Sequence, residues 1–153
     1  MKALIACFFS LCLAGALSAQ SQFTFEPAVD APEDVAYVHV LYKTESFTIP
    51  GLRLRTTFSP DDAIKVKPNS YSLLKVTEDY IGLLSNAPDQ EKPLILNLEK
   101  GQHYFYRFTF LPFNMNIDQL TADEFEMELF FNGIETEPRE VITTGLEGTT
   151  VQG

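Results

Sequence analysis

The sequence predicts a mainly β fold: an antiparallel β-sandwich with a short C-terminal helix and flexible termini. Two observations support this prediction. Short runs of aromatic and β-branched residues alternate with turn residues through most of the chain. The 153 residues also include 13 Phe and 6 Tyr but no Trp, which suits strands around an aromatic core. One later segment combines helix start and stop signals, and it is the source of the predicted helix.

Residues 1–19 have the three-part pattern of a secretory signal peptide. Lys2 precedes an uncharged apolar run at residues 3–17, and the small residues Ser18 and Ala19 follow it. This run is shorter than the about 20 apolar residues that a spanning helix needs. We therefore expect a protein exported to the periplasm or the cell exterior, without a membrane-spanning segment in the mature chain.

The mature chain is expected to start at Gln20 and to lack cysteine, because Cys7 and Cys12 both lie in the signal peptide. A chain without cysteine has neither a disulfide nor a thiolate metal site. Exported eukaryotic domains of this size usually carry disulfides, so this composition favours a bacterial envelope protein. The formal net charge of -10 argues against nucleic acid as a partner, because binding to phosphates needs basic surfaces.

Residues 20–34 carry four acids and two prolines and are expected to form an extended arm. The segment 35–43 is apolar on both faces, as in a central strand. In the segment 52–58, Leu52 and Leu54 alternate with charged residues, which indicates a half-buried strand. Further strands are predicted at 64–67, 70–77, 80–84, 94–98 and 103–110, and the turn at 99–102 is expected to join the last two as a hairpin.

Alternation within 103–110 assigns each side chain to a face of that strand. Tyr106 and Phe108 are expected to point into the core. Phe105 and Arg107 are expected to point to the other face, and Phe105 is therefore expected to contribute less to stability than Phe108.

Residues 111–118 are expected to connect this strand to the helix. Thr121 and Glu124 form a capping-box pattern at the start of the helix, and Gly133 is a typical stop. The run 124–129 alternates with the period of a strand instead, so a strand is the competing interpretation. The start and stop signals favour the helix.

On the predicted helix, Glu128 is expected to lie on the outer surface and to contribute little to stability. The sandwich domain, including this helix, is expected to span residues 35–133. Residues 134–153 are rich in Glu, Thr and Gly and are predicted to be a disordered tail.

The candidate ligand-binding residues lie on two predicted strands. His103, Phe105 and Arg107 on one strand, with Arg53 and Arg55 on the other, would form a face for an anionic or sugar ligand. The alternative is cross-strand packing together with salt bridges to the abundant acids. We favour this alternative, because long basic side chains commonly cover apolar strand surface.

The sequence predicts no catalytic residue, no metal site and no cofactor. His39 and His103 are its only histidines, and a metal site would need both of them to converge with acids. Neither HxH nor HExxH spacing is present. The sequence also lacks the GxSxG, GxxxxGK and GxGxxG patterns of nucleophilic, phosphate-binding and dinucleotide-binding sites.

Three segments carry a resemblance to a known family: the opening strand at 35–40, the short strand pair around 69–71, and the run 96–104, in which a glycine and a histidine join two strands. In these segments the chain resembles a family of small bacterial envelope proteins, many lipid-anchored, classified only as a domain of unknown function and similar to PEGA-type surface domains. The resemblance implies a β-sandwich with a helix after its last strand, and it implies no reaction. This chain departs from the family in lacking the lipid-anchor cysteine.

Together these observations predict an exported, non-enzymatic β-sandwich module that binds another envelope protein. The second interpretation is a carbohydrate- or small-ligand-binding domain that uses exposed aromatic and arginine side chains. The third is a periplasmic hydrolase that uses a carboxylate pair or His103.

Overall fold

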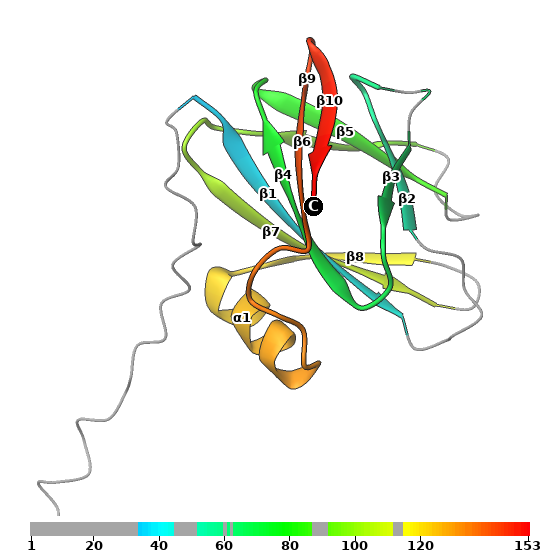
Figure 1. Ribbon diagram of the computed structural model, residues 1–153, viewed down its shortest axis with the longest axis vertical. Coiled ribbons are helices and arrows are strands. Elements are labelled where there is room, and N and C mark those ends of the chain that lie inside the picture. The colour runs from blue at the N-terminus through cyan, green and yellow to red at the C-terminus, as the bar shows by residue number, and fades with distance from the viewer. Residues whose placement is uncertain (1–33, 45–51, 60, 62, 87–91, 112–114) are drawn as a thin grey trace, which may run out of the picture.

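The computed structural model describes residues 34–44, 52–59, 61, 63–86, 92–111 and 115–153 (Figure 1). The predicted signal peptide at 1–19 and all of the predicted arm except Asp34 lie outside the described residues. The described chain forms a six-stranded sheet, a four-stranded sheet and one helix. The predicted mainly β class with a short C-terminal helix is thereby confirmed.

The six-stranded sheet has the strand order β10-β9-β4-β1-β7-β8, and the four-stranded sheet has the order β3-β2-β5-β6. The larger sheet contains β1 (Ala36–Thr44), β4 (Ser70–Val76), β7 (His103–Phe110), β8 (Met115–Leu120), β9 (Glu140–Gly145) and β10 (Gly148–Gln152). The smaller sheet contains β2 (Leu52–Thr56), β3 (Ala63–Val66), β5 (Tyr80–Ser85) and β6 (Leu94–Asn97). Each strand predicted from the sequence is present close to its expected bounds.

The main core lies between the two sheets. Val38 and Val40 of β1 and Phe108 of β7 enter it from the larger sheet, and Leu54 and Leu83 enter it from the smaller one. The strict alternation of β2, with buried leucines and exposed arginines, is as predicted. One face of each sheet is therefore committed to this core, as in a sandwich.

The pairing is mostly antiparallel, but β1–β7 and β4–β9 are parallel pairs. The predicted hairpin between 94–98 and 103–110 is therefore wrong, because β6 pairs with β5 in one sheet and β7 pairs with β1 in the other. The turn between them is real, with Gly101 at a φ of 76°. A turn signal specifies that the chain reverses direction, but it does not specify which strand the next segment pairs with. β7 has apolar residues on both faces, and beside the central strand β1 both faces are buried.

Two further expectations fail at the C-terminal end. The connector predicted at 111–118 contains the first four residues of β8, which forms an edge strand antiparallel to β7. The disordered tail predicted at 134–153 contains β9, which lies parallel to β4, and β10, which returns as a hairpin (Figure 1). Low apolar content predicted disorder there. Ile142 of β9 is nevertheless fully buried, so this segment contributes to the core.

The helix α1 (Ala122–Phe131) confirms the interpretation that the start and stop signals favoured. The Thr121 hydroxyl accepts a hydrogen bond from the Glu124 amide, and the Glu124 carboxylate accepts one from the Thr121 amide, which is the predicted capping box. At the other end Gly133 has a φ of 63°, and its amide donates to the Phe130 carbonyl. The Ile134 amide donates to the Leu129 carbonyl, which completes a Schellman motif.

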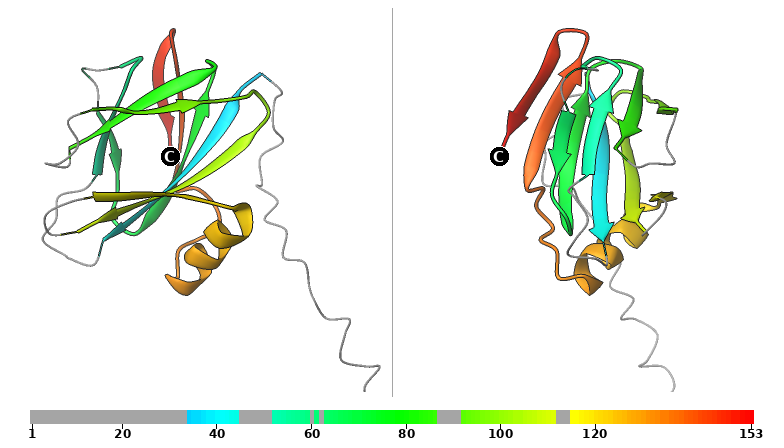
Figure 2. Two further views of the ribbon diagram at one scale, coloured as in Figure 1. Left: turned by 180° about the vertical axis from the view of Figure 1, so that it is seen from behind. Right: turned by 90° about the vertical axis from the view of Figure 1, so that its right-hand side faces the viewer.

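The helix packs on the face of the six-stranded sheet that points away from the four-stranded sheet (Figure 2). Phe125 and Leu129, one turn apart, are fully buried there against Tyr37, Leu41 and Phe105. The strands β1 and β7 are consequently covered on both faces. This second, smaller core lies between the helix and the six-stranded sheet.

Candidate functional site

The two histidines of the chain meet under the helix. His39 on β1 is fully buried, and its Nε2 lies 2.9 Å from Nδ1 of His103 on β7. On its other side, Nδ1 of His39 lies 2.6 Å from the hydroxyl of Tyr71 on β4. In the parallel pairing of β1 with β7, Tyr37 lies opposite His103 and His39 lies opposite Phe105. His39 and His103 are therefore neighbours on the same face of the larger sheet. The result, called the histidine chain below, is a row of hydrogen bonds from the buried phenol of Tyr71 through His39 to the half-buried imidazole of His103.

Aromatic rings enclose this chain. The His39 ring stacks on Phe105 with centroids 4.4 Å apart, and the His103 ring stacks on Tyr37 at 4.6 Å. Phe125 of the helix meets His39 edge-on. Burial, and then the neighbouring His103, lower the pKa of His39 to about 3, while burial raises the pKa of Tyr71. Both groups are therefore neutral near pH 7, and the Tyr71 phenol keeps its proton.

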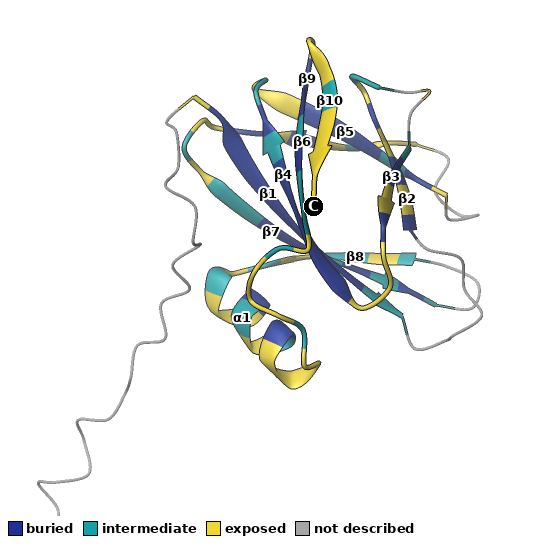
Figure 3. Ribbon diagram, in the orientation of Figure 1, coloured by how far each residue is buried: buried dark blue, intermediate teal, exposed yellow. Residues whose placement is uncertain are grey.

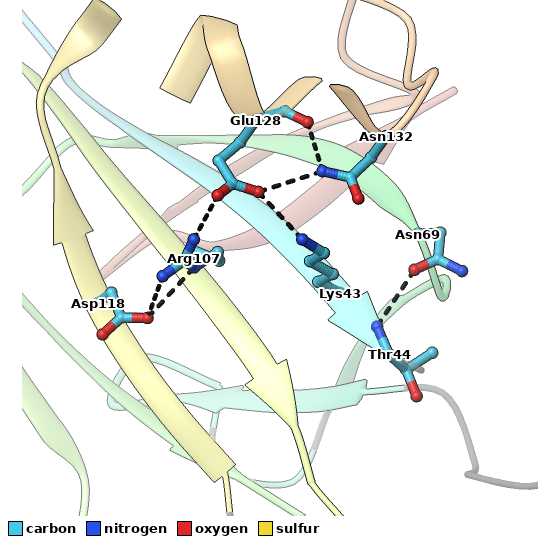
Figure 4. Close-up of polar contacts among 7 residues, drawn as sticks. All are labelled: Lys43, Thr44, Asn69, Arg107, Asp118, Glu128 and Asn132. Carbon is cyan, nitrogen blue, oxygen red and sulfur yellow. Dashed lines mark hydrogen bonds and ion pairs between the residues drawn. The ribbon is translucent and has the colours of Figure 1, made fainter. Parts of the chain in front are cut away.

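A second polar group lies at the far end of the helix (Figure 4). Glu128 on α1 accepts a hydrogen bond from Lys43 Nζ on β1 at 3.2 Å and another from Arg107 on β7. Arg107 also donates to Asp118 on β8 through Nε at 3.2 Å and Nη2 at 2.8 Å. Asn132 at the end of the helix donates to the backbone carbonyl and the carboxylate of Glu128. These contacts tie the helix to β1 and β7, and Asp118 connects Arg107 to β8.

In this group, Glu128 and Arg107 each stabilise the charged form of the other. Burial alone would raise the pKa of Glu128, but the bonds from Lys43 and the nearby Arg107 lower it overall. The hydrogen bond to Asp118 raises the pKa of Arg107. Glu128 and Arg107 therefore both remain charged near neutral pH. The expectation that Glu128 is a free surface acid is wrong, because the helix turns this side chain toward the sheet edge.

The outward face of the helix is apolar. Met127, Phe130 and Phe131 are spaced as i, i+3 and i+4, so they lie on one side of the helix, opposite the buried Phe125 and Leu129. Their exposed fractions are 52%, 79% and 79%, and the helix is largely exposed along this side in Figure 3. The two phenylalanine rings contact each other edge to face with centroids 5.7 Å apart. A helix held firmly on one side thus presents aromatic side chains on the other.

The predicted ligand-binding face is not assembled. Phe105 is only 8% exposed and lies beneath the helix, so it is a core residue. Arg107 is engaged by two carboxylates. Arg53 and Arg55 are exposed on β2 of the other sheet, so they do not share a face with His103. The predicted alternation of β7 is correct, but the helix covers the face on which a ligand was expected.

The two histidines do converge, as a metal site would require, yet carboxylates do not join them. Within the described ranges, three or more side chains of His, Cys, Asp or Glu never gather as a metal-binding group. Over the same residues, the structure has no helix with the length and apolar character needed to cross a membrane. The histidine chain is best understood as a satisfied polar element of the second core.

The apolar helix face and the role of Glu128 are not among the features predicted from the sequence. A signal for the face was present, because Met127, Phe130 and Phe131 occupy one side of a helix once residues 122–131 are assigned as helical. The partners of Glu128 could not be found in this way. They come from strands that are distant in sequence and adjacent only after folding.

The fold and these surfaces define a β-sandwich with an externally packed helix. No family model, curated protein or solved structure matches the chain. The resemblance to bacterial envelope domains therefore stays a prediction from the sequence.

Proposed function

We propose that this chain is an exported, non-enzymatic β-sandwich module of a bacterial envelope, and that it acts by binding another protein through the outward face of α1. The observation that carries the proposal is the exposure of Phe130 and Phe131 on an anchored helix. Exposed aromatic residues that cluster are typical of protein interaction sites. Export rests on the signal-peptide pattern at 1–19, and an envelope location rests on the mature chain's lack of cysteine.

The anchoring of the helix supports this assignment. The capping box, the Schellman motif and the Glu128 contacts hold α1 in one orientation before any partner arrives. A preorganised surface loses little conformational entropy on binding, so more of the contact energy contributes to affinity. A helix that presents anchors at i, i+3 and i+4 is also a common recognition element.

The histidine chain gives little support to a hydrolase. Rings of Tyr37, Phe105 and Phe125 surround it, and the low pKa of His39 makes this group a weak base. A general base works best with a pKa near the operating pH. The same enclosure disfavours a sugar site at His103 and Phe105, because sugar binding needs an accessible aromatic face.

The test is site-specific photo-crosslinking in the cell that produces the protein. A photo-reactive residue placed at Met127 should give one discrete protein adduct. The same residue placed at Ile95, which is 53% exposed on β6 of the other sheet, should not give that adduct. Adding Phe130→Ser to the Met127 probe should abolish the adduct if this face makes the contact. The proposal fails if both positions give the same adducts, or if Phe130→Ser has no effect.

A further inference from the structure

We propose that the partner presents an apolar stripe flanked by lysine or arginine side chains, and that this stripe docks on Met127, Phe130 and Phe131. This inference rests on the proposed function, because it names the chemistry of the partner for the same helix face. It follows from how charge is distributed around that face.

The negative charge of the protein is concentrated in the part of the chain that contains the helix. Residues 115–153 carry nine acids and a single base, Arg139, whereas residues 1–114 carry twelve acids and ten bases. Nearly all of the formal net charge of -10 therefore belongs to the C-terminal segment. Of these acids, Asp123, Glu124 and Glu126 lie on the helix itself, and a surface that carries charge of one sign attracts oppositely charged surfaces.

Acids also border the apolar residues directly. Asp123 and Glu124 are exposed in the first turn of α1, and the half-buried Glu126 precedes Met127. Hydrogen bonds from Thr121 lower the pKa of Glu124, so this carboxylate is charged at neutral pH. Lys43 and Arg107, two cations that contact the helix, are directed to Glu128 on its sheet-facing side. The outward face is thus an apolar centre with a negative rim.

This arrangement discriminates among possible occupants. Two copies of the chain would bring two acidic rims together, and like charges in contact oppose association. A membrane with anionic lipids would repel the same rim. A protein stripe with apolar residues at its centre and cations at its border matches both features. Charge complementarity would increase the association rate, and the aromatic contacts would slow dissociation.

The probes are three synthetic helical peptides, each tested by fluorescence anisotropy against the full chain. The first has a leucine stripe flanked by lysines, the second has glutamates in place of those lysines, and the third keeps the lysines but has serines in place of the leucines. The first peptide should bind about tenfold or more tightly than either of the others. Raising the salt from about 0.1 M to about 1 M shortens the Debye length from about 10 Å to about 3 Å, and binding should weaken strongly.

Two variants test the face itself. Phe130→Ser combined with Phe131→Ser should abolish binding of the first peptide, and an unchanged urea midpoint would show that the fold is intact. Glu126→Gln should weaken binding several-fold, mainly through the association rate. Glu147→Gln is the matched control, because Glu147 is an exposed acid in the β9–β10 turn, away from the helix (Figure 1). It should leave binding unchanged.

Several outcomes overturn the inference. Equal binding of the lysine and glutamate peptides would show that charge does not select the partner. If the serine peptide bound as tightly as the leucine peptide, the acidic rim alone would account for binding and the apolar residues would not contribute. A dimer in sedimentation that disappears with Phe130→Ser would identify a second copy as the occupant. Binding of phosphatidylcholine vesicles that needs Phe130 would identify a membrane. A discrete crosslinked partner with an acidic contact surface would retain the proposed function and refute only this inference.

Discussion

Phe105 shows how the outer layer changes the role of one side chain. Its position on β7 was correctly assigned to the face opposite Phe108, yet only 8% of it is exposed, because Phe125 of the helix lies on it with ring centroids 5.3 Å apart. The Phe105 ring also stacks on His39. A residue expected to meet a ligand is instead part of the second core.

Phe105→Ala should therefore cost about 3–5 kcal/mol of unfolding free energy, as should Phe108→Ala, because each substitution opens a cavity in a closed core. The exposed Phe130 is the control, and Phe130→Ala should change stability by about 0.5 kcal/mol or less. Urea denaturation of the three variants measures the comparison. A small cost for Phe105→Ala would mean that the helix does not cover this face in solution.

His39 should make stability depend on pH. Its pKa is about 3 in the folded protein and near its ordinary value of 6.5 in the unfolded chain, so between these values the unfolded chain binds a proton that the folded protein does not. The contribution of His39 is complete above pH 6.5 and decreases as the pH falls toward 3, by up to about 1.4 kcal/mol for each pH unit. Half-buried His103, whose pKa is also lowered by burial, acts in the same direction.

Urea melts at several pH values measure this dependence. His39→Gln keeps hydrogen-bonding groups beside Tyr71 and His103 but cannot titrate, so its stability should fall less steeply with acid than that of the parent chain. Parallel curves for the two proteins would show that His39 is accessible to protons in the folded state.

At the scale of elements, the helix depends on contacts at both its ends and on its inner face. Local sequence specifies the ends, through Thr121, Glu124 and Gly133. Tertiary structure specifies the rotation of the helix about its axis, because Phe125 and Leu129 must face the sheet. That rotation places Glu128 above Lys43 and Arg107, and it places Phe130 and Phe131 in solvent.

Glu128→Ala should therefore destabilise the protein by about 1 kcal/mol more than Glu126→Ala, since the two positions share a helix interior but only Glu128 joins two strands. High salt should reduce the difference, because the ion pairs are partly exposed. Thermal or urea unfolding at low and high salt provides the measurement. Equal effects of the two substitutions would argue that the Glu128 bridge contributes nothing in water.

At the scale of the whole molecule, the C-terminal hairpin completes the larger sheet. β9 lies beside β4, and Ile142 pairs with Leu74 in register, with both side chains fully buried. The hydroxyls of Ser59, Thr149 and Thr144 form a further connection, with each oxygen pair 2.9 Å apart, between this hairpin and the segment after β2. The C-terminal residues thus contact the larger sheet and the segment that follows β2.

Ile142→Ala should cost about 2–5 kcal/mol, which a residue in a disordered tail would not. Val151 lies opposite Ile142 in the hairpin and is 57% exposed, so Val151→Ala is a matched control that should cost about 0.5 kcal/mol or less. Denaturant melts distinguish the two. Equal unfolding free energies for the two variants would indicate that residues 134–153 are disordered, as predicted from the sequence.

Features that depend on near neighbours along the chain can be predicted from the sequence. Alternation identified β2 and β7, the capping box and Gly133 identified α1, and both faces of β1 were recognised as apolar. These features follow from the two-residue and 3.6-residue periods of strand and helix and from local backbone hydrogen bonds.

Features that depend on distant partners are fixed only when the chain folds. Pairing of β7 with β1 rather than β6, pairing of β9 with β4, and the meeting of His39 with His103 all join residues far apart in sequence. Backbone groups at a strand edge accept any complementary strand, so local sequence leaves these choices open. Burial against the whole sheet settles them, and it leaves Met127, Phe130 and Phe131 facing outward.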